Sequence, residues 1–242
     1  MSIGRNLLPA GLHQKLQLDR WFIHEFLRKN LMPNLRAGIR VLDAGSGRLP
    51  EQYLRNDILA TGATLETLDF MAGPGVDHVG DVAAMPFVDG QYDFVVCTQV
   101  FEHVPDPRQA CRELARVVKP GGQVIITVPQ SAFLHNLPYH FFHCTNIGLR
   151  LLVEESGLEI LAMEPQGGHF VNLAGQLHYT CRVIESTLTG KWKRRLLSPL
   201  TWCLRILLGF CTKVFLCYLD RKMPFPGNTQ GWNCLCRKPA GM

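Results

Sequence analysis

The 242-residue sequence has nine cysteines but no C-x-x-C pair. A zinc site or a disulfide framework would show paired cysteines, whereas an odd and scattered set predicts free thiols in a reducing compartment. The first 40 residues also lack a long apolar run followed by a small-residue cleavage site, so no secretory signal is expected. Both absences favour a cytoplasmic location.

The chain also carries little net charge. The net charge is +5, and much of it lies in the cluster Lys191–Arg195. A general nucleic-acid partner is therefore not predicted, because such partners need a broad basic surface. With 47% hydrophobic and 19% charged residues, the chain is long enough for one α/β domain with a full core and short for two.

The stretch that organises the chain is residues 41–54, VLDAGSGRLPEQYL. An apolar run ends at Asp43 as a buried strand would, Gly45 and Gly47 form a turn, and Pro50 suits the first position of a helix. Glycines allow a tight turn and let a ligand approach backbone amides. The residues expected to contact a ligand here are Asp43, Ala44, Gly45, Ser46 and Gly47.

The dinucleotide-binding pattern G-x-G-x-x-G is incomplete, because Pro50 stands where the third glycine belongs. A nicotinamide enzyme is therefore disfavoured. Asp43 would repel a pyrophosphate, but it can accept hydrogen bonds from a cation. The ligand is expected to carry positive charge beside Asp43.

Strand-like and helix-like runs alternate along the chain. Strands are expected at 63–70, within 76–87, at 92–98, 123–129 and 158–165, and helices at 11–32, after 50, from 106 and from 145 or 146. This alternation predicts a doubly wound α/β fold with a ligand at the carboxyl ends of parallel strands. Asp69 ends the second strand, where a carboxylate can accept hydrogen bonds from both hydroxyls of a ribose.

The motif V-L-D-x-G-x-G at 41–47 resembles the first motif of class I S-adenosylmethionine-dependent methyltransferases. The runs GDVAAMPF, YDFVVCTQVFEHV, ELARVVKPGG and VIITVP between 80 and 129 are similar to the same family. The resemblance covers about residues 36–165. It implies S-adenosyl-L-methionine as cofactor and a mostly parallel seven-stranded sheet with an antiparallel last strand. Beyond the turn, it implies these cofactor-binding residues: Asp69 and Phe70 near the ribose, Asp81 and Val82 at the adenine, and Thr98 and Gln99 at the end of strand four.

The segment Pro138–Thr145 should close over the cofactor if the family arrangement holds. Relatives in glycan and lipopolysaccharide clusters show P-x-D-Y-x-R-x-T there, whereas this chain has PYHFFHCT. The differing residues face the acceptor, which therefore stays open between a small molecule and a lipid-linked one.

For an oxygen acceptor, His103 and His143 are the candidate bases, since a neutral imidazole is common near pH 7. The alternatives are that His103 caps its turn and that His143 is a surface residue. His135, His140, His143 and Cys144 lack matching spacing elsewhere, so no metal site is predicted.

The sequence divides into an N-terminal helical segment 1–38, a cofactor-binding core 39–165, an inserted helical subdomain 166–230 and a final strand 231–239. Arg205 and Lys213 interrupt the apolar run 196–219, so it should not span a bilayer. With the basic cluster before it, a helix there suits an anionic membrane surface, giving membrane contact through 191–219. The alternatives are a lid on its own domain and an interface with a second copy of the chain.

The predicted function is S-adenosylmethionine-dependent methyl transfer to a small or lipid-linked acceptor, at oxygen. The alternative is a catalytically inactive cofactor-binding or interaction module on the same fold. Retention of Asp43, Gly45, Gly47, Asp69 and Asp81 argues against that alternative, because a module without the cofactor would have no need of the whole set.

Overall fold

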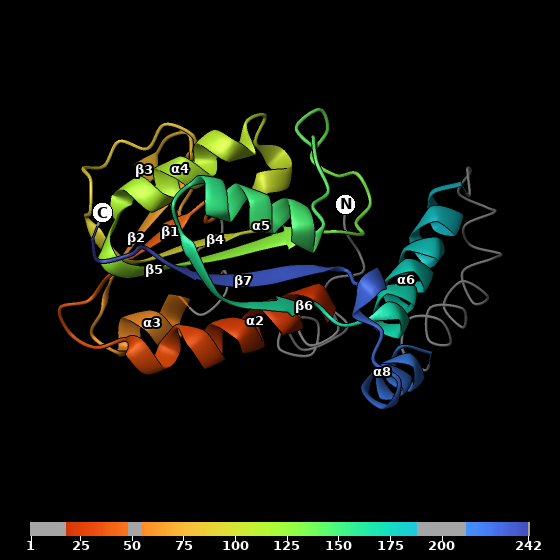
Figure 1. Ribbon diagram of the computed structural model, residues 1–242. Helices are drawn as coiled ribbons and strands as arrows, with labels where there is room; N and C mark the ends of the chain where they lie inside the picture. The colour runs from red at the N-terminus through yellow and green to blue at the C-terminus, as the bar shows by residue number, and fades with distance from the viewer. Residues whose placement is uncertain (1–17, 48–54, 188–211, 242) are drawn as a thin grey trace. The chain divides into compact units, whose positions relative to one another are not determined.

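The computed structural model describes residues 18–47, 55–187 and 212–241 (Figure 1). The chain forms two compact units. The first comprises Met1–Glu164 with Gly231–Met242, and the second is Pro165–Gln230.

The first unit is built on a seven-stranded sheet with the strand order β3-β2-β1-β4-β5-β7-β6. Strands β1 to β5 pair in parallel, and β7 pairs antiparallel with β5. The mostly parallel sheet with an antiparallel last strand is therefore confirmed. The strands are β1 Arg40–Ala44, β2 Thr64–Asp69, β3 His78–Val79, β4 Tyr92–Thr98, β5 Val118–Pro129, β6 Glu159–Pro165 and β7 Gly231–Arg237.

Helices cover both faces of this sheet. Helices α4 and α5 lie on one face, and α2 and α3 lie on the other (Figure 1). Successive strand residues point to opposite faces, so Leu42 joins the core under α4 and α5 while Val41 joins the core under α2 and α3. Burial on both faces explains why β4 is almost wholly apolar. The helices are α2 Leu18–Asn30, α3 Arg55–Ala60, α4 Pro107–Val117 and α5 Asn146–Glu155.

The predicted starts of two helices are confirmed by their caps. The side chain of Asp106 accepts a hydrogen bond from the Gln109 amide at 3.0 Å before α4, and Thr145 accepts one from the Gly148 amide at 3.1 Å before α5. Short 3-10 helices η1 Met32–Asn34 and η2 Phe101–His103 follow α2 and β4. The expected helix start at Pro50 lies outside the described residues, as does the expected beginning of the helix at 11–32.

Strand β5 differs from the expectation because it begins at Val118 rather than at 123. The sequence KPGG resembles a helix stop followed by a turn. In the structure the pairing register with β4 shifts between Tyr92 and Phe94, and Gly121 adopts a positive φ of 78°. A bulge at this glycine lets the strand continue through what looked like a turn.

The second unit contains helices α6 His169–Thr187 and α8 Thr212–Lys222 and the 3-10 helix η4 Pro226–Asn228. Asp220, near the end of α8, accepts hydrogen bonds from the Gly168 and Phe170 amides at 2.8 and 3.0 Å. Its carboxylate thus satisfies free amides at the start of α6, where negative charge is favourable. No helix in the described part of the chain is long and apolar enough to cross a membrane. The cluster 191–195 and most of the run 196–219 lie outside that part.

Candidate functional site

The turn after β1 is held by hydrogen bonds to β2. The amides of Gly45 and Ser46 both donate to the Leu68 carbonyl, at 2.7 and 3.0 Å, and the Gly47 amide donates to Oδ2 of Asp69 at 2.8 Å. Gly45 has a φ of 84°, and a Cβ placed on it would lie 2.3 Å from Cγ2 of Val100. Glycine is therefore required here both for the backbone conformation and for space.

Three acids lie at the carboxyl ends of the neighbouring strands β1, β2 and β3. Asp69 accepts hydrogen bonds from the Gly47 and Met71 amides through different oxygens, and both oxygens keep further acceptor capacity. The Gly80 amide donates to the Asp69 carbonyl at 3.0 Å, which brings Asp81 next to it. The structure thus brings Asp43, Asp69 and Asp81 to one edge of the sheet.

Asp43 is the most unusual of these acids. Its Oδ1 atom is buried and has no hydrogen-bond partner among the described residues. Burial raises the pKa of Asp43 to about 7, with Asp69 contributing in the same direction and Arg55 opposing. A buried acceptor without a donor is costly, and a cationic donor bound beside it would remove that cost. The hydroxyl of Thr98, at the end of β4, is also buried and unpaired within the described ranges.

These observations fit the cofactor expected from the sequence. S-adenosylmethionine offers an ammonium group and two ribose hydroxyls as donors. Asp43 and Asp69 offer acceptors beside a turn in which Gly45 leaves no room for a side chain. These acceptors and this turn are features of the folded chain, so they support cofactor binding in addition to the sequence resemblance to the family.

The remaining residues predicted to bind the cofactor have varied environments. Ala44, Ser46 and Val82 are buried, and the side chain of Phe70 is exposed. Gln99 has a positive φ of 54°, and its side-chain amide donates to the hydroxyl of Thr127 at 3.2 Å. Gln99 is therefore oriented by β5. The cofactor-binding roles of all these residues stay predictions.

Glu102 lies in η2, directly after β4, and is a residue that sequence analysis did not single out. Its side chain is buried, and neither carboxylate oxygen has a hydrogen-bond partner among the residues described. Burial raises the pKa of this carboxyl to about 8. The only hint in the sequence is an acid placed between the apolar residues Phe101 and Val104.

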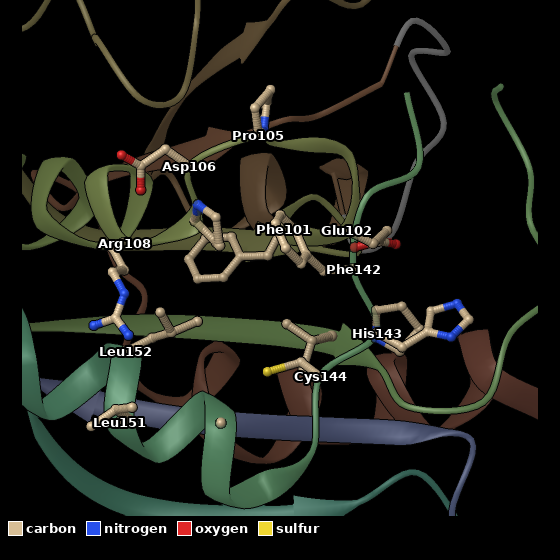
Figure 2. Close-up of a pocket in the computed structure, with 14 residues that line it drawn as sticks. Phe101, Glu102, Pro105, Asp106, Arg108, Phe142, His143, Cys144, Leu151 and Leu152 are labelled. Carbon is tan, nitrogen blue, oxygen red and sulfur yellow. The ribbon is translucent and has the colours of Figure 1, made fainter. Parts of the chain in front are cut away.

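A cavity of about 390 Å³ lies between the start of α4, the end of β5, residues 142–144 and α5 (Figure 2). Its walls are largely apolar. Glu102 and His143 lie toward one end, and Asp106 and Arg108 lie toward the other (Figure 2). The apolar wall residues are Phe101, Pro105, Pro107, Val128, Pro129, Phe142, Leu151 and Leu152.

The two candidate bases have different surroundings. His143 is one of the residues that line the cavity, and His103 is not. Nδ1 of His103 pairs with the Tyr139 carbonyl, and Nε2 lies 3.1 Å from Nε2 of His135. Burial lowers the pKa of His103. His143 therefore has the better position to meet a molecule in the cavity.

Residues 42–126 match a family model described as a methyltransferase domain. The chain is also 35% identical over 150 residues to the ubiquinone biosynthesis O-methyltransferase of Escherichia coli O139:H28, with 55% of each chain covered. It thus spans about half the length of the curated relatives it matches.

Solved structures share the fold at low sequence identity. One is the geranyl diphosphate C-methyltransferase of Streptomyces coelicolor in complex with Mg²⁺, geranyl diphosphate and S-adenosyl-L-homocysteine. Its superposition on this chain has a TM-score of 0.55 at 15% sequence identity, and it covers 89% of this chain and 79% of the Streptomyces chain. Another is phosphoethanolamine N-methyltransferase 2 of Haemonchus contortus in complex with S-adenosyl-L-methionine. Its superposition on this chain has a TM-score of 0.54 at 17% sequence identity, and it covers 90% of this chain and 52% of the Haemonchus chain.

Proposed function

Since this chain belongs to the class I S-adenosylmethionine-dependent methyltransferases, we propose that it transfers the methyl group of S-adenosyl-L-methionine to an oxygen atom of a small or lipid-linked acceptor. The observation that carries the proposal is the juxtaposition of Asp43, Asp69 and Asp81 at one edge of the sheet beside a glycine turn.

The residues of that edge would hold the cofactor. Asp43 would accept hydrogen bonds from its ammonium group, Asp69 would accept them from its ribose hydroxyls, and Asp81 with Val82 would contact its adenine. When bound, the cofactor supplies a methyl group on a sulfonium, which carries its own leaving group. No covalent nucleophile is then needed from the protein, whose task is to align the acceptor, exclude water and remove a proton.

The apolar cavity supports an acceptor with an aromatic or lipid-like body. Its walls would exclude water from such a group, while Glu102 and His143 offer polar contacts at one end. We assign the role of general base to His143, because it lines the cavity. His103 has both ring nitrogens in contact with other groups. His143 would take the proton of an acceptor hydroxyl as the methyl group is transferred.

Oxygen is favoured as the methylated atom by the curated relative, which is named as an O-methyltransferase. The two solved structures are named as a C-methyltransferase and an N-methyltransferase, so the fold itself does not select the atom. Their low identity leaves the acceptor to be determined by experiment.

The test is incubation with methyl-labelled donor and fractionated cell extract, using wild type, Asp69→Ala and His143→Gln. We expect the wild type to label an organic product in which the methyl group is on oxygen, and both variants to label it more slowly. If folded wild-type protein binds the donor but labels no fraction, the inactive cofactor-binding module becomes the better description.

We also propose that residues 191–219 contact an anionic membrane surface from the cytoplasmic side. The support is the sequence KWKRR followed by a largely apolar run. Flotation with anionic liposomes tests it: wild type should float at low salt, and a variant with all four cations changed to Gln should stay at the bottom. Equal flotation of both proteins would contradict the proposal. Liposome-independent dimerisation would favour the contact with a second copy.

A further inference from the structure

Three histidine rings form a cluster beside the cavity. His103 lies in η2, whereas His135 and His140 lie on the segment between β5 and α5. Their ring centroids are 4.8 Å apart for His103 and His135, 5.2 Å for His103 and His140, and 4.7 Å for His135 and His140. One candidate ligand nitrogen from each ring lies within 4.8 Å of the other two.

The contacts of His103 and His135 fix the same tautomer in both rings. Nδ1 of His103 faces the Tyr139 carbonyl, and Nδ1 of His135 faces the Phe133 carbonyl at 2.9 Å. A carbonyl can only accept, so in each neutral ring the proton is on Nδ1 and Nε2 carries a lone pair. Yet the two Nε2 atoms face each other at 3.1 Å. Two lone pairs at this distance repel each other unless a proton or a metal ion lies between them.

His140 completes a set of three nitrogen ligands. Its Nδ1 accepts a hydrogen bond from the His135 amide at 3.2 Å, and its Nε2 lies 3.0 Å from Nε2 of His143. To bind an ion, His140 would exchange one of these two contacts for the metal. Both contacts are exposed, and a candidate ligand nitrogen of His140 already lies within 4.8 Å of the nitrogens of His103 and His135.

We propose that His103, His135 and His140 bind one divalent transition-metal ion of the zinc type. In a tetrahedral zinc site with Zn–N bonds of about 2.0–2.1 Å, ligand nitrogens lie about 3.3 Å apart, close to the spacing of the first pair. Imidazole ligands select zinc, cobalt, nickel or copper over magnesium and calcium. The carbonyls of Tyr139 and Phe133 act as the outer partners that orient metal-binding histidines.

Three protein ligands leave one coordination position open. The carboxylate of Glu102 lies next to this cluster, with Oε1 3.8 Å from Nε2 of His103. An acceptor oxygen that entered the open position would lose its proton more readily. Metal binding itself goes beyond the proposed function, because it can be measured with no methyl donor present.

The experiment is a titration of metal-free, full-length protein with Co²⁺ and with Zn²⁺. Calorimetry measures the binding of both ions, and visible absorption measures the coordination of Co²⁺. We expect one equivalent of Co²⁺ to give the d–d spectrum of a four-coordinate site without a thiolate-to-metal charge-transfer band. His135→Gln and His140→Gln should each weaken binding by at least about 100-fold, since loss of a mere outer partner already costs 10–100-fold. The matched control is His78→Gln, a histidine on β3 that pairs with Glu66, and it should bind like wild type.

Three results would overturn the proposal. They are unchanged affinity in both cluster variants, no binding by the wild type with its circular dichroism intact, and a thiolate charge-transfer band that assigns the ion to cysteines. Mg²⁺ serves as a second probe and should not compete with Zn²⁺. None of these readouts depends on methyl transfer, so the failure of the metal site and the failure of the proposed function are distinguishable.

Discussion

The cofactor side and the acceptor side of the sheet edge are built by different means. On the cofactor side, at β1, β2 and β3, the geometry comes from backbone hydrogen bonds between consecutive strand ends, such as that from Gly45 to Leu68. On the acceptor side, the cavity and the histidine cluster are built mainly from side chains of η2, α4, β5, α5 and the segment 130–145.

This difference suggests where the protein can vary. A site made by backbone turns tolerates few substitutions, because Gly45 is fixed by φ and by space and Gly47 is fixed by its φ of 72°. A site made by side chains on a connecting segment can change its ligand without altering the sheet. We therefore expect substitutions on the cofactor side to reduce binding for any acceptor, and substitutions on the acceptor side to change rate or selectivity.

The largest effect is expected at the glycine turn. Gly45→Ala should destabilise the fold by about 2–5 kcal/mol and prevent cofactor binding, because the new Cβ meets Val100 and the residue must hold a positive φ. Gly38→Ala is the matched control, with a φ of 87° and no atom within 4 Å of the added Cβ. It should cost only about 1–2 kcal/mol.

Urea unfolding of both variants, with cofactor binding measured on the folded protein, checks this prediction. Adding Val100→Ala to Gly45→Ala should recover part of the lost stability. Equal losses at the two glycines would show that Val100 does not constrain the turn.

The next largest effect, at His143, should distinguish the acceptor side from the cofactor side. His143→Gln should lower the rate on an oxygen acceptor by about 100-fold, which is typical for loss of a general base, and leave cofactor affinity unchanged. Single-turnover rates and calorimetry on the same preparation provide the two measurements. A variant with the wild-type rate and pH profile would remove His143 from the chemistry.

The pH dependence of cofactor affinity should be set by Asp43. Its pKa of about 7 means that the carboxyl is largely protonated below that pH and cannot pair with a cation. Affinity should therefore rise by up to about tenfold per pH unit below pH 7 and level off above it. Besides burial, the groups that act on this carboxyl are Arg55, which lowers its pKa, and Asp69, which raises it.

Asp43→Asn should bind the cofactor weakly and without this pH dependence. Without ligand, the sign for stability is the opposite. The folded protein keeps a proton that the unfolded acid loses above about pH 4, so wild-type stability falls relative to the variant as the pH rises from about 4 to about 7. Parallel pH profiles of wild type and variant would contradict the assignment.

The smallest expected effect is on stability, from removing the N-caps of the two helices that border the cavity. Thr145→Ala removes the cap of α5 and should cost about 1 kcal/mol of stability, whereas Asp106→Ala should cost a similar amount at α4. Thermal unfolding measures both. Thr145 does not line the cavity, so a change of acceptor selectivity in Thr145→Ala would show that the segment before α5 shapes the site. Unchanged selectivity in Thr145→Ala would contradict that role.

Much of the cofactor side could be predicted from the sequence because its determinants are local. Strand ends, glycines and acids occur at regular intervals, and the parallel topology brings the strand ends together. The helix starts at Asp106 and at Thr145 or Asn146 could be predicted for the same reason, since a capping side chain bonds to an amide a few residues away.

The acceptor side could not be predicted because its contacts join residues far apart in the chain. His103 meets His135 across 32 positions, and neither spacing nor periodicity reveals this pairing. Glu102 was missed because its burial depends on packing after the chain has folded. The bulge in β5 was missed because KPGG has the composition of a turn whether or not a neighbouring strand continues the ladder.

The central claim is that the glycine turn and the acids of β1 and β2 form a binding site for S-adenosylmethionine. Calorimetric titration of wild type and Asp69→Ala with S-adenosyl-L-homocysteine tests it most directly. We predict one site in the wild type and a loss of about 1–3 kcal/mol of binding free energy in Asp69→Ala, where the ribose loses its acceptor. An absence of heat at several temperatures, from wild-type protein whose fold is intact by circular dichroism, would contradict the claim.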